Sequence, residues 1–169
     1  VETGPSSDPP MNWRISSLDR FTFISNSDAH SAQKLGREAN LFDTDLSYYS
    51  ILSAIRSANP DQFIGTVEFY PEEGKYYLDG HRKCNIRLQP GETVRHKGHC
   101  PACGRPVTLG VLHRISELAD RAENYRPENR PSFYNLIPLT EMLSETLGFG
   151  QQTKRVMKAY RSLLNRFGP

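Results

Sequence analysis

Two pairs of potential metal ligands constrain this chain more than any other feature. Two residues separate His81 from Cys84, two separate Cys100 from Cys103, and fifteen lie between the pairs. A two-residue gap lets one tight turn point both side chains at the same ion, and four such ligands satisfy tetrahedral zinc. The spacing therefore predicts one structural zinc ion that holds a β hairpin against the second pair.

The residues leave one alternative open, in which Cys84 is a buried thiol and Cys100 and Cys103 form a redox pair. A thioredoxin-like motif opens a helix after a strand in a βαβ unit, and that setting is missing here. His96 and His99 are nearer to the second pair in sequence, but neither forms a two-residue-gap pair with a cysteine on its side. We interpret both histidines as solvated.

Length and composition allow a modest core. The chain has 169 residues, of which 37% are hydrophobic, enough for one small domain or two small lobes. Three cysteines cannot all pair within one chain, which favours a reducing compartment. No window is apolar enough to span a membrane, and the first 20 residues lack the order of a secretory signal. We expect a soluble, cytoplasmic protein with no membrane partner.

Hydrophobic periodicity and turn residues give a coarse map of the chain. Residues 1–12 are predicted to be a loop, residues 21–24 a buried strand, and residues 63–70 with 75–78 a β hairpin. The segments with helical spacing are 31–40, 46–57, 109–123, 139–147 and 152–167.

Asp28 and His30 are metal-competent side chains two residues apart, at the end of the predicted strand 21–24. Residues i and i+2 point the same way while the backbone stays extended, so both could face one ion. The alternative is that Asp28 caps a helix beginning near Ser31 and that His30 makes a local hydrogen bond. Spacing alone favours this alternative.

Several segments beyond this pair carry a family resemblance. They are Ser27-Asp28-Ala29-His30, Lys34-Leu35-Gly36-Arg37-Glu38-Ala39-Asn40, residues 6–14, 79–84, 100–106, 110–114, 130–131 and 133–139. Together they resemble PHP-type phosphoesterases and, more specifically, the endonuclease Q family over nearly the whole chain. The resemblance identifies Asp28 and His30 as part of the last catalytic metal motif of a PHP domain.

The resemblance implies a metal-dependent hydrolase of DNA repair, which nicks DNA on the 5′ side of deaminated bases or abasic sites. Mg²⁺, Mn²⁺ or Zn²⁺ would occupy the catalytic site of the full-length protein, and Zn²⁺ the structural site. PHP domains begin with a His-x-His motif, which this chain lacks. We therefore expect a C-terminal fragment that misses its N-terminal PHP segment and is inactive alone.

The expected fold class is α+β, in three segments. Residues 1–59 would be a C-terminal remnant of a PHP α/β domain, residues 60–108 a small zinc-ribbon-like β lobe, and residues 109–169 a helical C-terminal region. The family resemblance assigns the catalytic metals to the first of these, and it assigns the grip on DNA to the other two.

The expected partner is DNA, damaged by base deamination, as duplex or single strand. Net charge is only +2, but residues 151–169 hold five basic residues and no acid. A second region interleaves aromatic and basic residues between prolines, which suits stacking on a flipped base. The predicted DNA contacts are Lys154, Arg155, Lys158, Arg161, Arg126, Arg130, Phe133, Tyr134 and Asn135.

The alternative for the second region is an arm whose aromatic side chains pack on the zinc lobe. Two further functions stay open from the sequence. One is a non-catalytic zinc-ribbon DNA-binding module associated with a helicase, in which Asp28 and His30 are merely structural. The other is a small-molecule PHP phosphatase.

Overall fold

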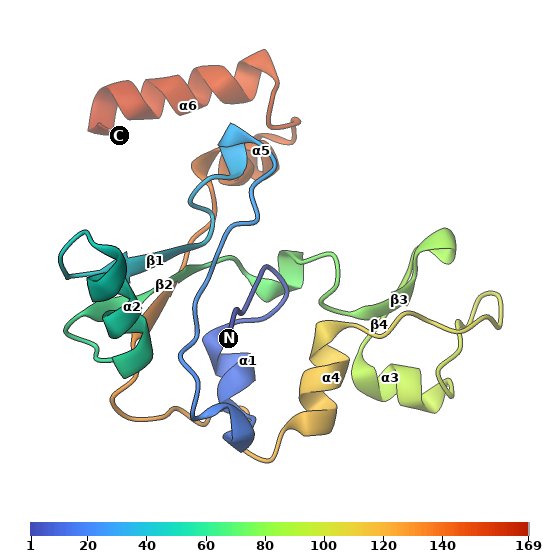
Figure 1. Cartoon of the computed structure of the whole chain (residues 1–169). Coiled ribbons are helices and arrows are strands. Elements are labelled where there is room, and N and C mark those ends of the chain that lie inside the picture. Colours follow the sequence, from blue (N-terminus) through green and yellow to red (C-terminus); the bar gives the residue numbers. More distant parts are fainter. Residues whose placement is uncertain (169) are drawn as a thin grey trace. The chain divides into compact units, whose positions relative to one another are not determined.

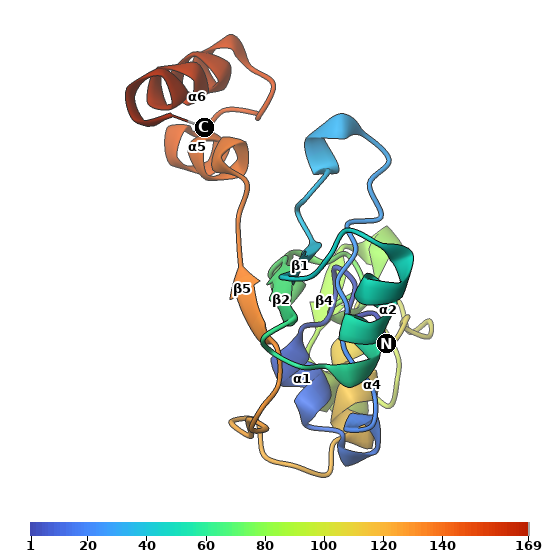
Figure 2. The same cartoon turned by 60° about the vertical axis from the view of Figure 1, so that its left-hand side comes forward.

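Strand β2 (Phe63–Glu68) is the centre of a three-stranded sheet in the computed structural model, which describes residues 1–168. Strand β1 (Ala39–Phe42) pairs with it antiparallel, and strand β5 (Ser132–Asn135) pairs with it parallel. In Figures 1 and 2, β5 runs along β2 although the two are distant in sequence. Five of the six residues of β2 are buried, as expected of a central strand.

The predicted hairpin of residues 63–70 and 75–78 is wrong in its second half, because residues 75–78 form turns and no strand. Strand β2 pairs closely with β5 and not with the predicted neighbouring strand at residues 75–78. A Cβ atom on Gly65 would lie 2.2 Å from the backbone oxygen of Ser132, so only glycine permits this parallel pairing. Local alternation identified β2 as a strand but could not reveal its distant neighbours.

Helix α1 (Pro9–Trp13) lies in the segment predicted to be a loop. An Asp8 carboxylate oxygen accepts a hydrogen bond from the Met11 N–H at 2.8 Å, and two prolines occupy the first helical positions. Proline fits there because the first N–H groups of a helix have no partner within it. The turn-forming composition therefore marked a helix start, and the helix ends on the buried Trp13.

The predictions for residues 21–24 and 31–40 are also wrong. Ile24 makes only an isolated parallel bridge to Glu2, and the second segment holds one 3₁₀ turn (Ala32–Lys34) before β1 begins. Leu35 is 71% exposed, so a helix here would have no apolar face against the core. Gly36, at φ +74°, takes the chain out of a helical conformation.

Helix α2 (Tyr48–Ser57) confirms the helix predicted at 46–57. It starts after Ser47, whose hydroxyl accepts a hydrogen bond from the Ser50 N–H at 3.1 Å. The left-handed conformation of Ala58 ends it. Ala54 is the fully buried residue of this helix, which lies at one end of β1 and β2 (Figure 1).

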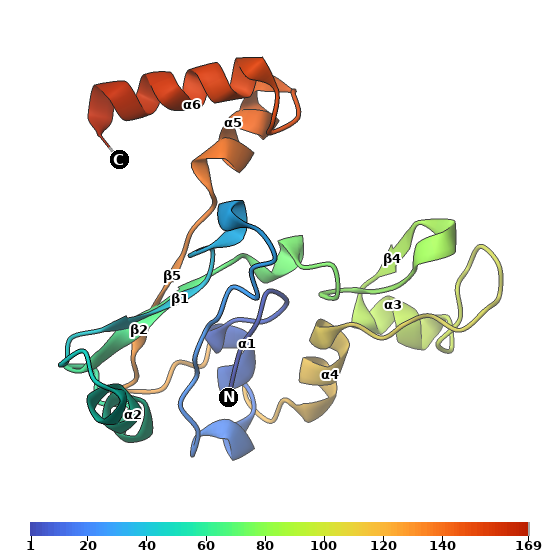
Figure 3. The same ribbon diagram turned by 45° about the horizontal axis from the view of Figure 1, so that its top comes forward.

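Four short elements surround the two ligand pairs. Strands β3 (Asp79–His81) and β4 (Ile86–Leu88) form an antiparallel hairpin, followed by helix α3 (Pro90–Arg95). Helix α4 (Val111–Leu118) comes after the second pair and is shorter than the predicted 109–123. Figure 3 shows the hairpin and α3 on one side of α4, and α1 on its other side.

The chain divides into two compact units, the second of which begins at Leu136. In that unit, helices α5 (Leu139–Leu147) and α6 (Lys154–Phe167) confirm the two helices predicted at 139–147 and 152–167, and they pack together. Val156 is fully buried, and Gly148, at φ +68°, ends α5. The α+β fold class is thus confirmed, while the boundaries at 59/60 and 108/109 stay a prediction.

A pair of buried carboxylic acids lies beside the three-stranded sheet. Glu68 is fully buried and accepts hydrogen bonds from the hydroxyls of Thr66 (2.5 Å), Thr3 (3.0 Å) and Ser25 (3.1 Å). Burial, followed by the repulsion of Glu68, raises the pKa of Glu38 to about 7. The folded protein therefore favours a protonated Glu38 at mildly acidic pH.

This pKa shift predicts a pH dependence of stability. The folded-state pKa of Glu38 lies above its ordinary value of 4.5, so its favourable contribution is complete below pH 4.5 and is lost as the pH rises through about 7. Glu38→Gln should therefore raise the melting temperature relative to wild type more at pH 8 than at pH 5. Thermal denaturation of both proteins at the two pH values measures this, with Glu128→Gln on the exposed surface as the control. An equal effect of Glu38→Gln at both pH values would contradict the assignment.

Candidate metal centre and nucleic-acid interface

The four predicted ligands come together at one point. His81 ends β3, and the 3₁₀ turn Arg82–Cys84 brings Cys84 back toward it, with His81 Nδ1 3.2 Å from Cys84 Sγ. Cys103 Sγ lies 3.3 Å from the same nitrogen. One ligand atom from each of these three residues and from Cys100 lies within 4.8 Å of every other. Among the residues described, no other such group of three or more potential ligands occurs.

Backbone hydrogen bonds shape the second turn around its ligands. The Cys100 N–H donates to the Arg105 carbonyl at 2.7 Å, and the Gly104 N–H donates to the Cys100 carbonyl at 2.8 Å. Gly104 has φ +70°, a conformation that glycine adopts at no steric cost. Cys100 is buried while Cys103 is exposed, so the cluster lies at the protein surface with one side in the core.

The geometry of this cluster fits a tetrahedral zinc ion. Bond lengths of about 2.3 Å to sulfur and about 2.0 Å to nitrogen place sulfur atoms about 3.8 Å apart and nitrogen about 3.5 Å from sulfur. The observed separations, 3.2 Å, 3.3 Å and none above 4.8 Å, require only small adjustments. Thiolate and imidazole ligands favour zinc over the hard cations Mg²⁺ and Ca²⁺. With four protein ligands, such a site has no open position for a reacting water.

The thiols of the cluster interact with one another. The hydrogen bond to Cys103 raises the pKa of Cys84 to about 11, whereas the Arg105 N–H lowers the pKa of Cys103. A metal binds the thiolate, so coordination must displace the proton of Cys84.

A buried hydrogen bond between an aspartate and a histidine joins the metal cluster to α4, and no pattern in the sequence assigned this pair a role. An Asp79 carboxylate oxygen lies 2.5 Å from His113 Nδ1, and the other accepts the Gly110 N–H at 2.6 Å. Asp79 is only 1% exposed. Since Asp79 is two residues before the ligand His81, this contact positions the hairpin on α4. Both residues stood in the segments that carried the family resemblance, the one signal that could have singled them out.

Asp28 and His30 do not gather a third ligand in the described part of the chain. Asp28 has φ +44°, so the extended backbone that would aim both side chains the same way is not present. His30 Nδ1 lies 2.8 Å from the Asp28 carbonyl, the kind of local contact considered for it. Asp28 does not cap a helix, because the 3₁₀ turn after Ser31 has no side-chain cap.

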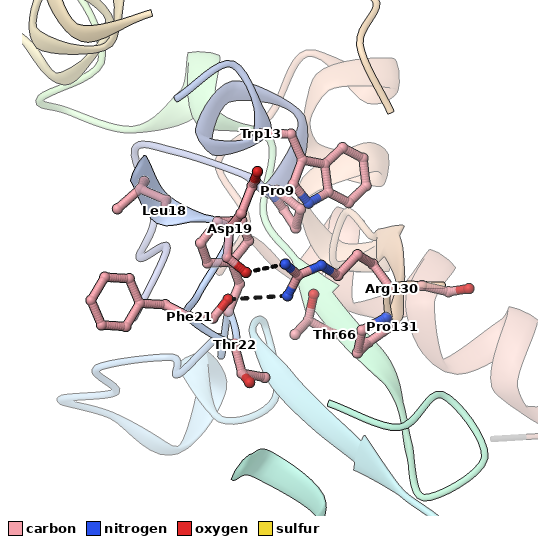
Figure 4. Close-up of a pocket in the computed structure, with 11 residues that line it drawn as sticks. Pro9, Trp13, Leu18, Asp19, Phe21, Thr22, Thr66, Arg130 and Pro131 are labelled. Atoms are coloured by element: carbon pink, nitrogen blue, oxygen red, sulfur yellow. Dashed lines mark hydrogen bonds between the residues drawn. The ribbon is translucent and has the colours of Figure 1, made fainter. Parts of the chain in front are cut away.

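Two of the residues predicted to bind DNA are engaged within the unit that ends at Asn135. Phe133 packs edge-on against Trp13 at 5.6 Å, and Arg130 donates hydrogen bonds to the carbonyls of Asp19 and Phe21. Figure 4 shows this guanidinium at a small hollow, with its dashed hydrogen bonds to the two carbonyls. These contacts anchor β5 to the N-terminal region, and the aromatic side chain meets Trp13 instead of the zinc lobe.

The other residues of this region are more accessible. Arg126 is exposed, with its guanidinium 5.7 Å from the centre of the Trp13 ring and 5.6 Å from that of Phe133. Tyr134 is 48% exposed, on a strand where Asn135 is half-buried. Arg126 and Tyr134 therefore retain faces that a ligand could contact.

Helix α6 presents a basic face. Lys154, Arg155, Lys158 and Arg161 are all exposed, while Val156 on the opposite side is fully buried. Lys154, Lys158 and Arg161 also line a shallow hollow together with Gln152 and Asn165. The spacing of these cations over two helical turns suits the backbone of a nucleic acid.

Comparison with known proteins finds relatives that are longer than this chain. The PHP-associated family matches residues 14–60. An uncharacterized protein of Methanocaldococcus jannaschii is 36% identical over 99% of this chain and 22% of its own length. The protein YqxK of Bacillus subtilis is 35% identical over 82% of this chain and 35% of its own length.

Two solved structures share this fold. The lesion-specific endonuclease PfuEndoQ of Pyrococcus furiosus superposes with a TM-score of 0.81 at 33% identity. An endonuclease Q complex with a 27-mer duplex substrate, which has an abasic lesion at the active site, superposes with a TM-score of 0.84 at 32% identity. Each match covers 99% of this chain and 42% of the other. The chain thus spans less than half of the length of the relatives it matches.

None of the helices described is long and apolar enough to cross a membrane.

The cluster predicts one tightly held zinc ion per chain. Cys84→Ser and His81→Ala should each lose most of the zinc, and they should lower the melting temperature because metal binding contributes on the order of 10 kcal/mol to folding. Elemental analysis of the purified variants measures the metal content. Two controls, His99→Ala and Asp28→Ala, should keep one zinc per chain, since neither side chain belongs to the cluster. Zinc retained in Cys84→Ser, or lost in Asp28→Ala, would disprove this assignment.

Proposed function

Starting from the confirmed resemblance of this chain to endonuclease Q, we propose that it is the C-terminal portion of a metal-dependent DNA endonuclease. The whole enzyme would nick DNA on the 5′ side of deaminated bases or abasic sites. The observation that carries this proposal is the match to an endonuclease Q bound to an abasic duplex, which covers 99% of the chain. A chain that keeps this fold over its entire length is suited to hold the same class of ligand.

Within the proposed enzyme, the residues of this chain divide into two roles. Asp28 and His30 would supply a carboxylate and an imidazole to the catalytic metals, whose remaining ligands belong to the rest of the PHP domain. Mg²⁺, Mn²⁺ or Zn²⁺ there would activate water and neutralise charge on the phosphate. Two exposed side chains are too few to hold a divalent ion, so we expect this chain alone to be inactive.

The zinc cluster would then be structural and the basic helix would bind the substrate, and neither would take part in the chemistry. The four-ligand site leaves no position for water and instead fixes the β3–β4 hairpin. Lys154, Arg155, Lys158 and Arg161 would contact phosphates, an interaction that is independent of base sequence. Arg126, Tyr134 and Asn135 remain proposed contacts, and Arg130 and Phe133 would hold this segment in place through their own contacts in the N-terminal region.

Nicking by a longer protein tests the catalytic role. The chain joined to a complete PHP domain should cut a duplex that contains uracil, hypoxanthine or an abasic site when Mg²⁺ or Mn²⁺ is present. Asp28→Ala and His30→Ala should each reduce the cleavage rate at least about 100-fold, in line with the loss of a metal ligand. A gel assay of 5′-labelled duplex measures the rate, with Asp43→Ala, another exposed acid, as the matched control.

Two results would contradict the proposal. One is a protein that binds damaged duplex but never cuts it, as expected of a non-catalytic zinc-ribbon module associated with a helicase. The other is undiminished cutting by the Asp28→Ala and His30→Ala variants.

Salt dependence tests the role of helix α6. The double variant Lys158→Gln/Arg161→Gln should bind duplex DNA more weakly. The negative slope of log K against log salt concentration should become less steep by about 0.9 for each lost phosphate contact. Fluorescence anisotropy at several salt concentrations measures both quantities. Arg114→Gln serves as the control, because Glu117 already neutralises Arg114 at 2.8 Å. Equal slopes for the wild type and the double variant would rule out this surface.

A further inference from the structure

A cleft of about 550 Å³ opens beside the metal cluster, within the unit that ends at Asn135. Its walls are the turn at residues 72–78, the β3–β4 hairpin and residues 108–110. No part of the proposed catalytic or helical surface lies in it. The side chains that matter here are Glu72, Lys75, Tyr76, Arg82, Asn85 and Arg87.

Backbone hydrogen bonds hold the walls of this cleft in place. Gly80 and Thr108 exchange two of them, at 2.9 and 2.8 Å. The Tyr76 carbonyl accepts from the Val111 N–H at 2.8 Å, so the 72–78 turn is tied to the first residue of α4. A ligand would meet a surface that is already formed, which reduces the entropy lost on binding.

The cleft offers cations and an amide that the protein itself leaves unused. Arg82 and Arg87 are exposed, and neither guanidinium makes a hydrogen bond or ion pair within residues 1–168. The same holds for the side-chain amide of Asn85, where a left-handed turn joins the two strands. Guanidinium groups bind phosphate oxygens in pairs, and an amide can donate to and accept from a base edge.

An exposed aromatic ring completes the set. Tyr76 is 61% exposed, and Lys75 Nζ lies 5.0 Å from the centre of its ring. The acids of the cleft offset these cations only in part. Asp79 is buried and bonded to His113 and Gly110, which leaves Glu72 as the one exposed acid among the residues that line the cleft. Positive charge around an accessible ring is the composition of a nucleic-acid surface.

We propose that this cleft binds a short unpaired stretch of a DNA strand, with one base stacked on Tyr76, its edge at Asn85 and adjacent phosphates at Arg82 and Arg87. The inference rests on the proposed function, since it names the form of DNA that a second surface of this chain takes. It adds a site beyond the catalytic residues and helix α6.

The aromatic ring argues for an unpaired strand instead of a duplex. In a duplex each base lies between its neighbours, so its face cannot reach a protein ring, whereas an unpaired base stacks freely. The ligands of the metal cluster also serve this site. Arg82 directly follows His81 and Asn85 directly follows Cys84, so coordination of these two ligands would fix the turn that presents both side chains.

Photocrosslinking of the zinc-loaded chain tests the proposal. The probe is a single-stranded octanucleotide of thymidines in which one base is 5-iodouracil, and mass spectrometry identifies the crosslinked residue. We expect Tyr76 to be crosslinked in the wild type. Anisotropy with the same labelled strand should show affinity reduced at least about fivefold in Tyr76→Leu and retained in Tyr76→Phe, because stacking needs only the ring.

The salt dependence of binding tests the two arginines of the cleft, Arg82 and Arg87. For binding of the single strand, Arg82→Gln and Arg87→Gln should each make the negative slope of log K against log salt concentration less steep by about 0.7. Arg56→Gln on helix α2, which removes the same charge outside the cleft, should leave the slope unchanged. Two results would overturn this inference alone. One is a Tyr76→Leu variant that binds the single strand with wild-type affinity, and the other is crosslinks that lie only outside residues 72–110. A chain that binds neither duplex nor single strand overturns both this inference and the proposed function.

Discussion

The convergence of four side chains on one metal position is the constraint on which the middle of this molecule depends. The β3–β4 hairpin has only three residues in each strand, too few to be stable in water by themselves. The second turn, at Cys100 to Cys103, has no regular structure of its own. Coordination of a metal ion at this cluster would supply the free energy that such short elements cannot gain from apolar burial, as it does in other small metal-binding lobes.

The cluster also determines what its neighbours can do. Asp79 connects the hairpin to His113 and to the Gly110 N–H, so the metal lobe and α4 are held as one piece. Removal of either partner would leave a buried polar group without its hydrogen bond, which costs about 1–3 kcal/mol. Residues placed by this frame, Arg82 and Asn85 among them, therefore have fixed positions although they lie on the surface. A binding surface can be built on turns when a metal site and a buried hydrogen bond hold those turns.

Local chemistry made part of this structure predictable. The ligand spacing identified the metal cluster, and strong amphipathic periodicity identified α2, α4, α5 and α6. The failures occurred where a distant partner decides the outcome. Strand β2 accepts β5 only because Gly65 leaves room for it, and residues 31–40 cannot form a helix without a core to face. Asp8-Pro9-Pro10 indicated a loop by composition, although the same residues suit the first turn of a helix.

The candidate site shows the same division between local and distant information. The basic face of α6 follows from spacing along one helix, whereas the packing of Phe133 against Trp13 depends on residues 120 positions apart. No spacing rule could find the Asp79–His113 pair, for the same reason.

Zinc-edge X-ray absorption of the purified chain measures most directly whether His81, Cys84, Cys100 and Cys103 bind one zinc ion. It should show three sulfur ligands at about 2.3 Å and one nitrogen at about 2.0 Å. A shell made mainly of oxygen, or one with fewer than three sulfurs, would contradict it.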